Sequence, residues 1–158
     1  INRSQIIKII DSNTLEEEFY VFKNYPSTLN IEIQETKFLA QTNKQNDIFF
    51  LGSNGKLTKT IETRSDIPYI FGDFKNKNFF DLKKAIDDSN FEFDQVKNLF
   101  FYKSGRWDIE THNGLLIKLP KYKMKESLEL LVLFLNQNKK KKIKELDLRQ
   151  NNQIILNG

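Results

Sequence analysis

Residues 96–119 constrain the fold most strongly, because three short apolar runs alternate there with two glycine-containing turns. The runs are VKNLFFY, RWDIET and LLIKL, and the turns between them are Lys-Ser-Gly and His-Asn-Gly. Apolar runs of this length, separated by such turns, are typical of strands joined as hairpins. This stretch therefore predicts a meander of three antiparallel strands.

The second turn also predicts how its two strands pair. A two-residue Asn-Gly loop would place Ile109 opposite Lys118 and mix apolar and charged side chains on one face. A three-residue loop over residues 112–114 instead pairs Ile109 with Ile117 and requires a left-handed backbone at Gly114. The other pairs expected in this register are Trp107 with Leu119, Thr111 with Leu115, and Asp108 with Lys118, the last on the solvent face.

The remaining periodicity predicts an α+β protein. Helices are expected over residues 2–10, 78–90 and 124–138. The third helix is apolar over most of its circumference, which predicts that it is well buried. The residues expected on the buried face of the second helix are Phe79, Leu82, Ala85 and Ile86.

Further strands are expected on both sides of the meander. Two strands are expected over residues 17–23 and 29–34, a hairpin over 46–60, and a closing hairpin over 145–156 that turns at 150–153. Between them, residues 65–74 are interrupted by Pro68 and Gly72 and predict an irregular connector.

Composition excludes several classes of protein. A length of 158 residues suits one ordinary domain or two small ones. The absence of cysteine excludes disulfides, thiolate metal sites and cysteine nucleophiles. No apolar run approaches the roughly 18 residues that span a bilayer, and no signal peptide begins the chain. Because the chain begins at Ile1 without methionine, we expect a preceding segment upstream, such as a membrane anchor.

The residues offer little for catalysis or metal binding. The single histidine, His112, falls at a hairpin tip, where a turn role is expected. The acidic run over residues 16–18 lies in a strand, so its side chains point to opposite faces. Asp87 and Asp88 are expected to end a helix. No phosphate-binding glycine loop, histidine–carboxylate metal spacing or nucleophile elbow occurs, so we predict a protein that is not an enzyme and holds no metal.

The four lysines over residues 139–142 are the most conspicuous charge feature. They could contact nucleic acid or an anionic lipid surface, or form a solvated loop, and the loop is preferred. Only four of the 25 cations are arginine, and the aromatic residues fall in strand patterns rather than among arginines. A basic nucleic-acid-binding module is therefore the alternative, and no nucleic-acid partner is expected.

Four segments in order resemble the periplasmic part of the bacterial cell-division family FtsQ/DivIB. They are NYPSTLNIEIQETKFLA (24–40), IPYIFG (67–72), RWDIETHNGLLIKL (106–119) and IKELDLRQNNQIIL (143–156). The first segment resembles a family strand that begins near a proline and ends in alanine, and the second resembles the family's Leu-Pro connector. The third resembles its tryptophan-containing strand with an Asn-Gly turn, and the fourth its closing Asp-Leu-Arg strand. The resemblance covers nearly the whole chain.

The resemblance implies an α+β architecture in two parts. A small POTRA-type domain would occupy residues 1–41, and a mainly antiparallel β domain with a C-terminal helix and closing strands would occupy residues 42–158. The link between SQIIKII and LEEEFYV is shorter than in the family. The POTRA-like domain is therefore expected to be reduced or incomplete.

The resemblance also implies a function and partners. The protein would be a non-catalytic scaffold of the divisome at the septum, anchored in the inner membrane by a single-pass segment, with this region in the periplasm. Its implied partners are FtsB and FtsL, and other divisome proteins would be contacted through the POTRA-like domain. No cofactor is implied.

The implied site is the closing edge of the sheet, where a strand of FtsB would add to the last strand. Arg149 is the leading residue, as a cation able to hold a partner carboxylate. The alternative for Arg149 is an ion pair with Asp147 or Glu145. Gln150 stands where the family often has tyrosine. The positions that match the partner-binding region are Leu148, Arg149, Gln150, Asn152, Gln153, Ile154 and Ile155.

Overall fold

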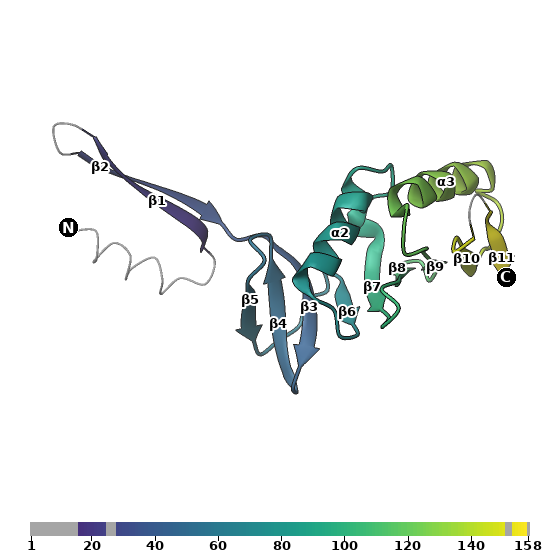
Figure 1. Cartoon of the computed structure of the whole chain (residues 1–158), viewed down its shortest axis with the longest axis horizontal. Helices are drawn as coiled ribbons and strands as arrows, with labels where there is room; N and C mark the ends of the chain where they lie inside the picture. Colours follow the sequence, from purple (N-terminus) through teal and green to yellow (C-terminus); the bar gives the residue numbers. More distant parts are fainter. Residues whose placement is uncertain (1–15, 25–27, 151–152, 158) are drawn as a thin grey trace. The chain divides into compact units, whose positions relative to one another are not determined.

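The computed structural model describes residues 16–24, 28–150 and 153–157 (Figure 1). The helix expected over residues 2–10 lies outside these residues, and so does Asn152. By its internal contacts the chain divides into two compact units, Ile1–Thr63 and Arg64–Gly158. The expected boundary between residues 41 and 42 falls within a strand, Phe38–Lys44, and the two-domain assignment stays a prediction.

The first unit contains a hairpin and a three-stranded meander. The hairpin pairs β1 (Glu16–Asn24) with β2 (Thr28–Glu35), which confirms the two strands expected there. The meander consists of antiparallel strands β3 (Phe38–Lys44), β4 (Asp47–Gly52) and β5 (Leu57–Thr60). Between β4 and β5 the Gly52 N–H donates to the Lys56 carbonyl (2.9 Å), and Gly55 has a positive φ of 82°. The hairpin expected over residues 46–60 is therefore confirmed.

Strand β3 has no counterpart among the expected strands. A β-bulge shifts the register between Phe38 and Ala40, so the side chains do not alternate regularly along FLAQTNK. Since the prediction relied on strict alternation, a bulged strand gave it no signal.

The second unit is a six-stranded mixed sheet with two helices. Its strand order is β11-β10-β9-β8-β7-β6. The strands are β6 (Tyr69–Phe71), β7 (Val96–Phe101), β8 (Trp107–Thr111), β9 (Leu116–Lys118), β10 (Glu145–Asp147) and β11 (Ile155–Asn157). The helices are α2 (Asn76–Asp87) and α3 (Met124–Gln137), and a 3₁₀ turn, η1 (Phe93–Gln95), precedes β7. These elements confirm the α+β class.

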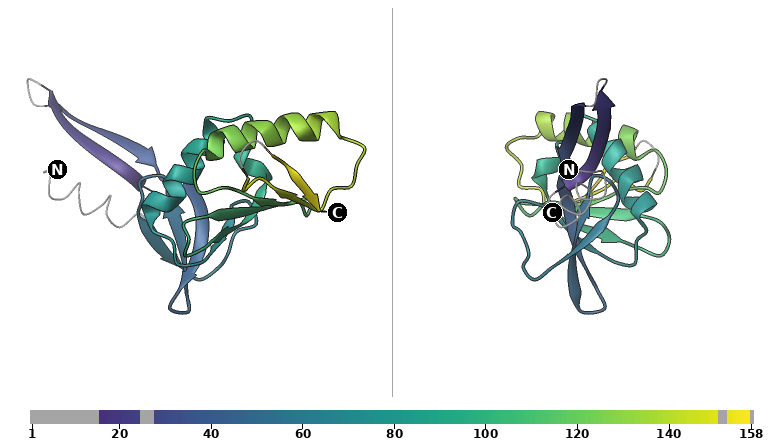
Figure 2. Two further views of the ribbon diagram at one scale, coloured as in Figure 1. Left: turned by 45° about the vertical axis from the view of Figure 1, so that its right-hand side comes forward. Right: turned by 90° about the vertical axis from the view of Figure 1, so that its left-hand side faces the viewer.

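Two of the strand pairs are parallel, and each is joined by a helix. Helix α2 connects β6 to β7, and α3 connects β9 to β10. Parallel neighbours need such a crossover, whereas the antiparallel neighbours here are joined by short turns. Figures 1 and 2 show both helices on the same side of the sheet.

The β6 assignment corrects the expectation of an irregular connector over residues 65–74. Tyr69–Phe71 pairs in parallel with β7, and Ile70 is buried in the core. The strand is only three residues long and lies between Pro68 and Gly72. With Pro68 and Gly72 on either side, three residues are too few to show the alternation that predicts a strand.

The core lies between the helices and one face of the sheet. All four residues expected on the buried face of α2 are buried. One row of side chains across the sheet faces this core, and its members from β6 to β10 are at most 1% exposed. They are Ile70, Leu99, Ile109, Ile117 and Leu146.

The register predicted for the β8–β9 turn is confirmed. Ile109 pairs with Ile117, and Asp108 pairs with Lys118. The Leu119 N–H donates to the Trp107 carbonyl (3.1 Å), and Gly114 has a φ of 88°. The expectation that Asp108 faces solvent is wrong, because only 3% of this residue is exposed. Tyr102 and Arg106, from the β7–β8 turn, cover and bond its carboxylate.

The expectation that α3 is well buried is also wrong. Only Leu128 and Leu131 are buried on this helix, while Leu133 is 59% exposed. The apolar sequence of α3 exceeds what the sheet can cover, so one side of the helix remains open. No helix of the described residues is long and apolar enough to cross a membrane.

Candidate functional site

Strand β11 is the outermost strand of the second unit's sheet among the described residues. It pairs antiparallel with β10, with Leu156 opposite Leu146 and Ile155 opposite Asp147. Leu156 therefore continues the buried core row by one strand, yet it is 46% exposed. The outer edge of β11 thus offers backbone N–H and C=O groups together with an incompletely covered apolar row.

The opposite face of the same edge exposes one apolar residue, Ile155. Ile155 lies at the end of a row that runs through Lys118 and Asp147, and it is 38% exposed. Strand β11 contains no charged residue. A strand added outside β11 could cover Ile155 on one face and Leu156 on the other.

Arg149 forms the ion pair that was the alternative for it. Its Nε donates to Asp147 Oδ1 (2.9 Å), a terminal guanidinium nitrogen donates to Oδ2 (2.6 Å), and its own backbone N–H donates to Oδ1 (3.0 Å). These bonds lower the pKa of the nearly buried Asp147 carboxyl, and the hydrogen bond from the Arg149 side chain is the main cause. In this arrangement the charge of Arg149 is balanced within the chain.

A hollow lies between α3 and the closing segment. The buried Leu148 lines it, together with the exposed residues Gln150 and Gln153. On the helix side it is lined by Leu130 and Leu133. The hollow adjoins residues predicted to contact a partner, and on its helix side the exposed Leu130 and Leu133 lie among polar side chains such as Glu126.

The residues of α3 in this hollow were missed by the sequence analysis. The signal is the helical spacing of Glu126, Leu130 and Leu133, which places one acid and two leucines along one side. The helix was predicted to be apolar over most of its circumference and well buried, so no part of it was considered as a contact surface.

The remaining predicted positions are distributed over the same closing segment. Gln150 and Gln153 form its turn, in which the Gln153 N–H donates to the Gln150 carbonyl (3.2 Å). Ile154 is half-buried, and Ile155 begins β11. The structure brings these residues to one edge of the sheet, and whether they bind a partner stays a prediction.

A second polar cluster lies on the face of the sheet away from the helices. The Tyr102 hydroxyl donates to Asp108 Oδ2 (2.9 Å), and Arg106 donates to Asp108 Oδ1 (2.9 Å) and to the Leu119 carbonyl (3.0 Å). Burial, followed by the bond to Asp108, raises the pKa of Tyr102. All three groups are used in internal bonds, so this cluster stabilises the β7–β8 turn.

The described residues contain no group of three or more histidine, cysteine or acidic side chains that could hold a metal ion. His112 is exposed in the β8–β9 loop, and its backbone N–H donates to the Gln95 carbonyl (3.0 Å). The two features at this end of the sheet are the outer edge of β11 and the hollow beside α3, which contains two exposed leucines.

Comparison with known proteins identifies the class. The family model described as the C-terminal part of the cell division protein FtsQ/DivIB matches residues 40–149. This match covers most of the chain, and the chain belongs to the FtsQ/DivIB family of cell-division proteins. Strand β11 lies beyond the matched residues.

Individual relatives agree with this assignment. The cell division protein FtsQ of Rickettsia bellii (strain RML369-C) is 25% identical over 159 residues, which cover 99% of this chain and 60% of that protein. FtsQ of Rickettsia prowazekii (strain Madrid E) is 26% identical over 145 residues, which cover 89% of this chain and 54% of that protein. The chain thus spans little more than half the length of these relatives.

A solved structure is also similar. It is the major extracytoplasmic domain of the trans isomer of the bacterial cell division protein DivIB from Geobacillus stearothermophilus. The match has 13% sequence identity and a TM-score of 0.46, and it covers 69% of this chain and 99% of that one.

Proposed function

We propose that this chain is the periplasmic part of a non-catalytic divisome scaffold that binds FtsB and FtsL, with a partner strand extending the sheet at β11. The observation that carries the proposal is the core row that ends on Leu156. Five strands bury this row almost completely, and the sixth leaves it 46% exposed. Adding one strand would cover it and satisfy the open backbone groups of the edge.

The hollow beside α3 would supply specificity. A chain that pairs with β11 passes close to Gln153, which lines the hollow with Leu130 and Leu133. Apolar partner side chains could pack on these leucines, while the backbone pairing itself is independent of sequence. Affinity would come from the edge, and partner choice from the hollow.

The wider placement of the chain follows from the family. Residues 1–41 would form a reduced POTRA-like domain that contacts other divisome proteins, and residues 42–158 the β domain. A single-pass anchor upstream would hold both at the septum on the periplasmic side of the inner membrane. A single apolar segment in the gene just before Ile1 would support this placement, and a cytosolic domain there would contradict it.

The test is binding to the periplasmic parts of FtsB and FtsL from the same genome. We expect the full chain to capture them, and a chain that ends at Arg149 to lose FtsB because it lacks β11. The substitution Ile154→Pro, at the residue just before β11, should also weaken binding because proline removes a backbone donor and fixes φ. Circular dichroism and thermal unfolding would establish that both variants remain folded.

A matched control is available beside the other outer strand. Ile61 follows β5 directly and is 90% exposed, so Ile61→Pro places the same substitution next to a strand that is not proposed to bind. It should leave FtsB binding unchanged. Full binding by both the truncated chain and the Ile154→Pro variant would overturn the proposal.

The alternative of a nucleic-acid-binding module has one supporting observation, the exposure of Lys139–Lys142. It predicts binding to bulk DNA that weakens steeply between low and moderate salt. Such binding, without capture of FtsB, would favour the alternative.

A further inference from the structure

The lysines at residues 139–142 and 144 form a cluster, here called the lysine loop, that places five cations within six residues. All five are exposed, and within the described part of the chain none makes an ion pair with an acid. Elsewhere in the unit some lysines are paired, such as Lys83 with Asp87 (2.6 Å) and Lys118 with Glu145 (3.2 Å), while others without an ion pair among the described residues, such as Lys97 and Lys103, are spread along the chain. Unbalanced positive charge is thus concentrated in one short segment.

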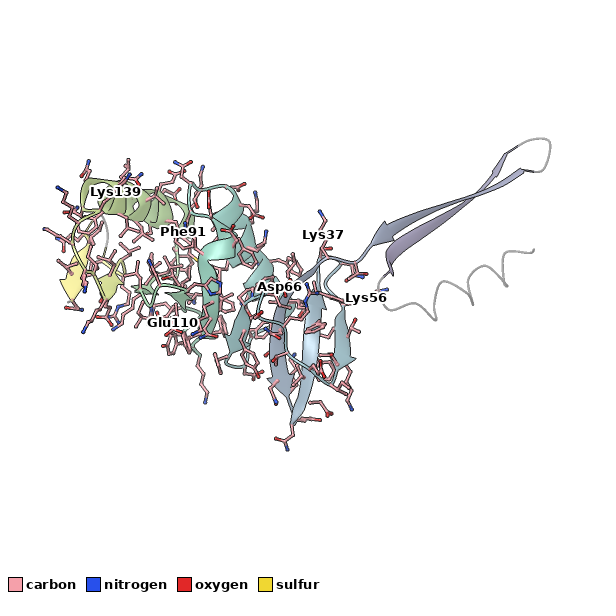
Figure 3. The ribbon with its side chains drawn as sticks, turned by 180° about the vertical axis from the view of Figure 1, so that it is seen from behind. Lys37, Lys56, Asp66, Phe91, Glu110 and Lys139 are labelled. Atoms are coloured by element: carbon pink, nitrogen blue, oxygen red, sulfur yellow. The ribbon has the colours of Figure 1, made fainter. Side chains whose placement is uncertain are left out.

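The lysine loop is held at both ends. At its start, Asn138 caps α3 through its side-chain amide, which donates to the Phe134 carbonyl (2.8 Å), and the Lys141 N–H donates to the Asn138 carbonyl (3.1 Å). At its end, the Lys144 carbonyl accepts the Leu116 N–H (2.9 Å). The charges therefore have a fixed place in the fold, at the end of α3 where Figure 3 labels Lys139.

This place adjoins one end of the open edge. The lysine loop leads directly into β10, whose first residue, Glu145, pairs with Asn157, the last residue of β11. Glu145 is already engaged, because it accepts a hydrogen bond from the Asn157 side chain and pairs with Lys118. It therefore does not neutralise the adjacent lysines.

The two ends of the edge differ in charge. At the Ile155 end, Arg149 is balanced by Asp147 (2.6 Å). At the Asn157 end, the five lysines have no counter-charge among the described residues. A helix C-terminus does favour cations, but that effect is confined to the last turn of α3 and does not require five lysines beyond it.

Building on the proposed function, we propose that the lysine loop binds an acidic segment of the partner protein, located at the end of the added strand that lies beside Asn157. The loop attracts this segment before the backbone pairs form and fixes the direction and register of the strand. Such long-range attraction acts mainly on the association rate and weakens with salt.

The test compares two variants with the same change in net charge. The first replaces the four consecutive lysines, K139Q/K140Q/K141Q/K142Q. The control replaces four exposed lysines elsewhere, K37Q/K56Q/K97Q/K103Q. Association and dissociation rates with the periplasmic parts of FtsB and FtsL would be measured by surface plasmon resonance at several salt concentrations.

We expect the lysine-loop variant to associate about 10-fold more slowly at low salt, with a flatter salt dependence, and its dissociation rate to change less. The control should stay within about 2-fold of the unmodified chain. The acidic residues at each end of the partner's strand would then be neutralised in turn. Only neutralisation at the end expected beside Asn157 should reproduce the slow association.

The outcomes separate this inference from the function on which it rests. Equal association rates for both variants, with FtsB still captured, would overturn the lysine loop's role and leave the proposed function standing. Failure of the unmodified chain to bind FtsB would overturn both. Loss of binding to anionic vesicles or to DNA by the lysine-loop variant, with no change in partner association, would show that the loop binds those surfaces instead.

Discussion

The outer strands β5 and β11 expose similar backbone edges but very different side chains. In β5 a lysine, Lys59, occupies the middle of a four-residue strand, with its side chain 64% exposed and paired to Asp47 (3.3 Å). In β11 no residue is charged, and Ile155 and Leu156 are 38% and 46% exposed. Natural edge strands commonly carry a lysine that prevents unwanted pairing, and only β5 follows that rule.

The difference teaches that exposure of an edge is not enough to indicate a partner. Strand β5 ends a meander in which Thr42, Phe49 and Lys59 form one row, so the row finishes on a solvated charge. The row that reaches β11 finishes on a leucine instead. A row of β5 also stops on a leucine, Leu57 opposite Leu51, but Leu57 is half-buried, whereas Leu156 is 46% exposed. This difference is why β11 is the edge that we expect to be extended.

The largest effect is expected where the core row is fully buried. Leu146→Ala in β10 should reduce the free energy of unfolding by about 3 kcal/mol, because it leaves a cavity beneath α3. Leu156→Ala in β11 should cost less than about 1 kcal/mol in the free chain, because about half of this residue is already in water. Urea unfolding of both variants measures the difference.

The two leucine variants should also differ in FtsB binding, where Leu156→Ala is the one expected to have the larger direct effect. If a partner strand covers Leu156, then Leu156→Ala will weaken FtsB binding, while the stability of the free chain is almost unchanged. Equal stability losses for the two leucines would contradict the comparison, since they would show that β11 is already part of a complete core.

The next largest effect is expected on FtsB binding when β11 is given a lysine of the kind that β5 carries at Lys59. Leu156→Lys should weaken FtsB binding by about 10- to 100-fold, because a charge at this position must lose its water when a strand covers it. The control Leu156→Ile keeps the apolar character and should bind within about 3-fold of the unmodified chain. Titration calorimetry measures both, and unchanged affinity for the lysine variant would exclude β11 as the paired edge.

Much of this fold could be predicted from residues that alternate cleanly. The β8–β9 register followed from one turn, because only a three-residue loop kept Ile109 and Ile117 on the same face. The buried face of α2 followed from helical spacing. By contrast, β3 contains a bulge and β6 has only three residues, so neither presents the period of a strand.

The candidate site was harder to predict because it depends on what is left uncovered. The sequence indicated the closing segment, but it did not show that Asp147 holds Arg149, or that Leu133 of α3 remains in solvent. Whether an apolar helix is covered depends on the width of the sheet beneath it. That width is a property of the assembled strands and not of the helix sequence.

A smaller effect on stability is expected from the ion pair between Arg149 and Asp147, at the Ile155 end of the β11 edge. Arg149→Ala should lower stability by about 1 kcal/mol at pH 7, because it removes the partner of the nearly buried Asp147 carboxylate. The pKa of Asp147 is lowered in the folded chain, chiefly by the hydrogen bond from Arg149. The stabilisation is therefore complete above the ordinary aspartate pKa of about 4 and is lost as the pH falls below it.

Urea unfolding at pH 7, 5 and 3 provides the measurement for Arg149. The difference between the unmodified chain and the variant should be similar at pH 7 and 5 and should shrink by pH 3. A difference that stays constant down to pH 3 would show that the pair does not carry the stabilisation. Loss of FtsB binding beyond the stability change would support direct contact between Arg149 and a partner carboxylate.

The smallest effect on stability is expected at β5, where removing the protecting charge tests the other half of the comparison. Lys59→Val breaks only the exposed ion pair with Asp47 and should change the free energy of unfolding by no more than about 0.5 kcal/mol. It should, however, increase self-association, because valine leaves the β5 edge apolar and able to pair with a second copy. Sedimentation velocity at increasing concentration measures this, and FtsB binding at β11 should be unaffected. If Lys59→Val stays monomeric while binding FtsB normally, the lysine is not what keeps β5 unpaired, and the contrast between the two edges would rest on the apolar residues of β11 alone.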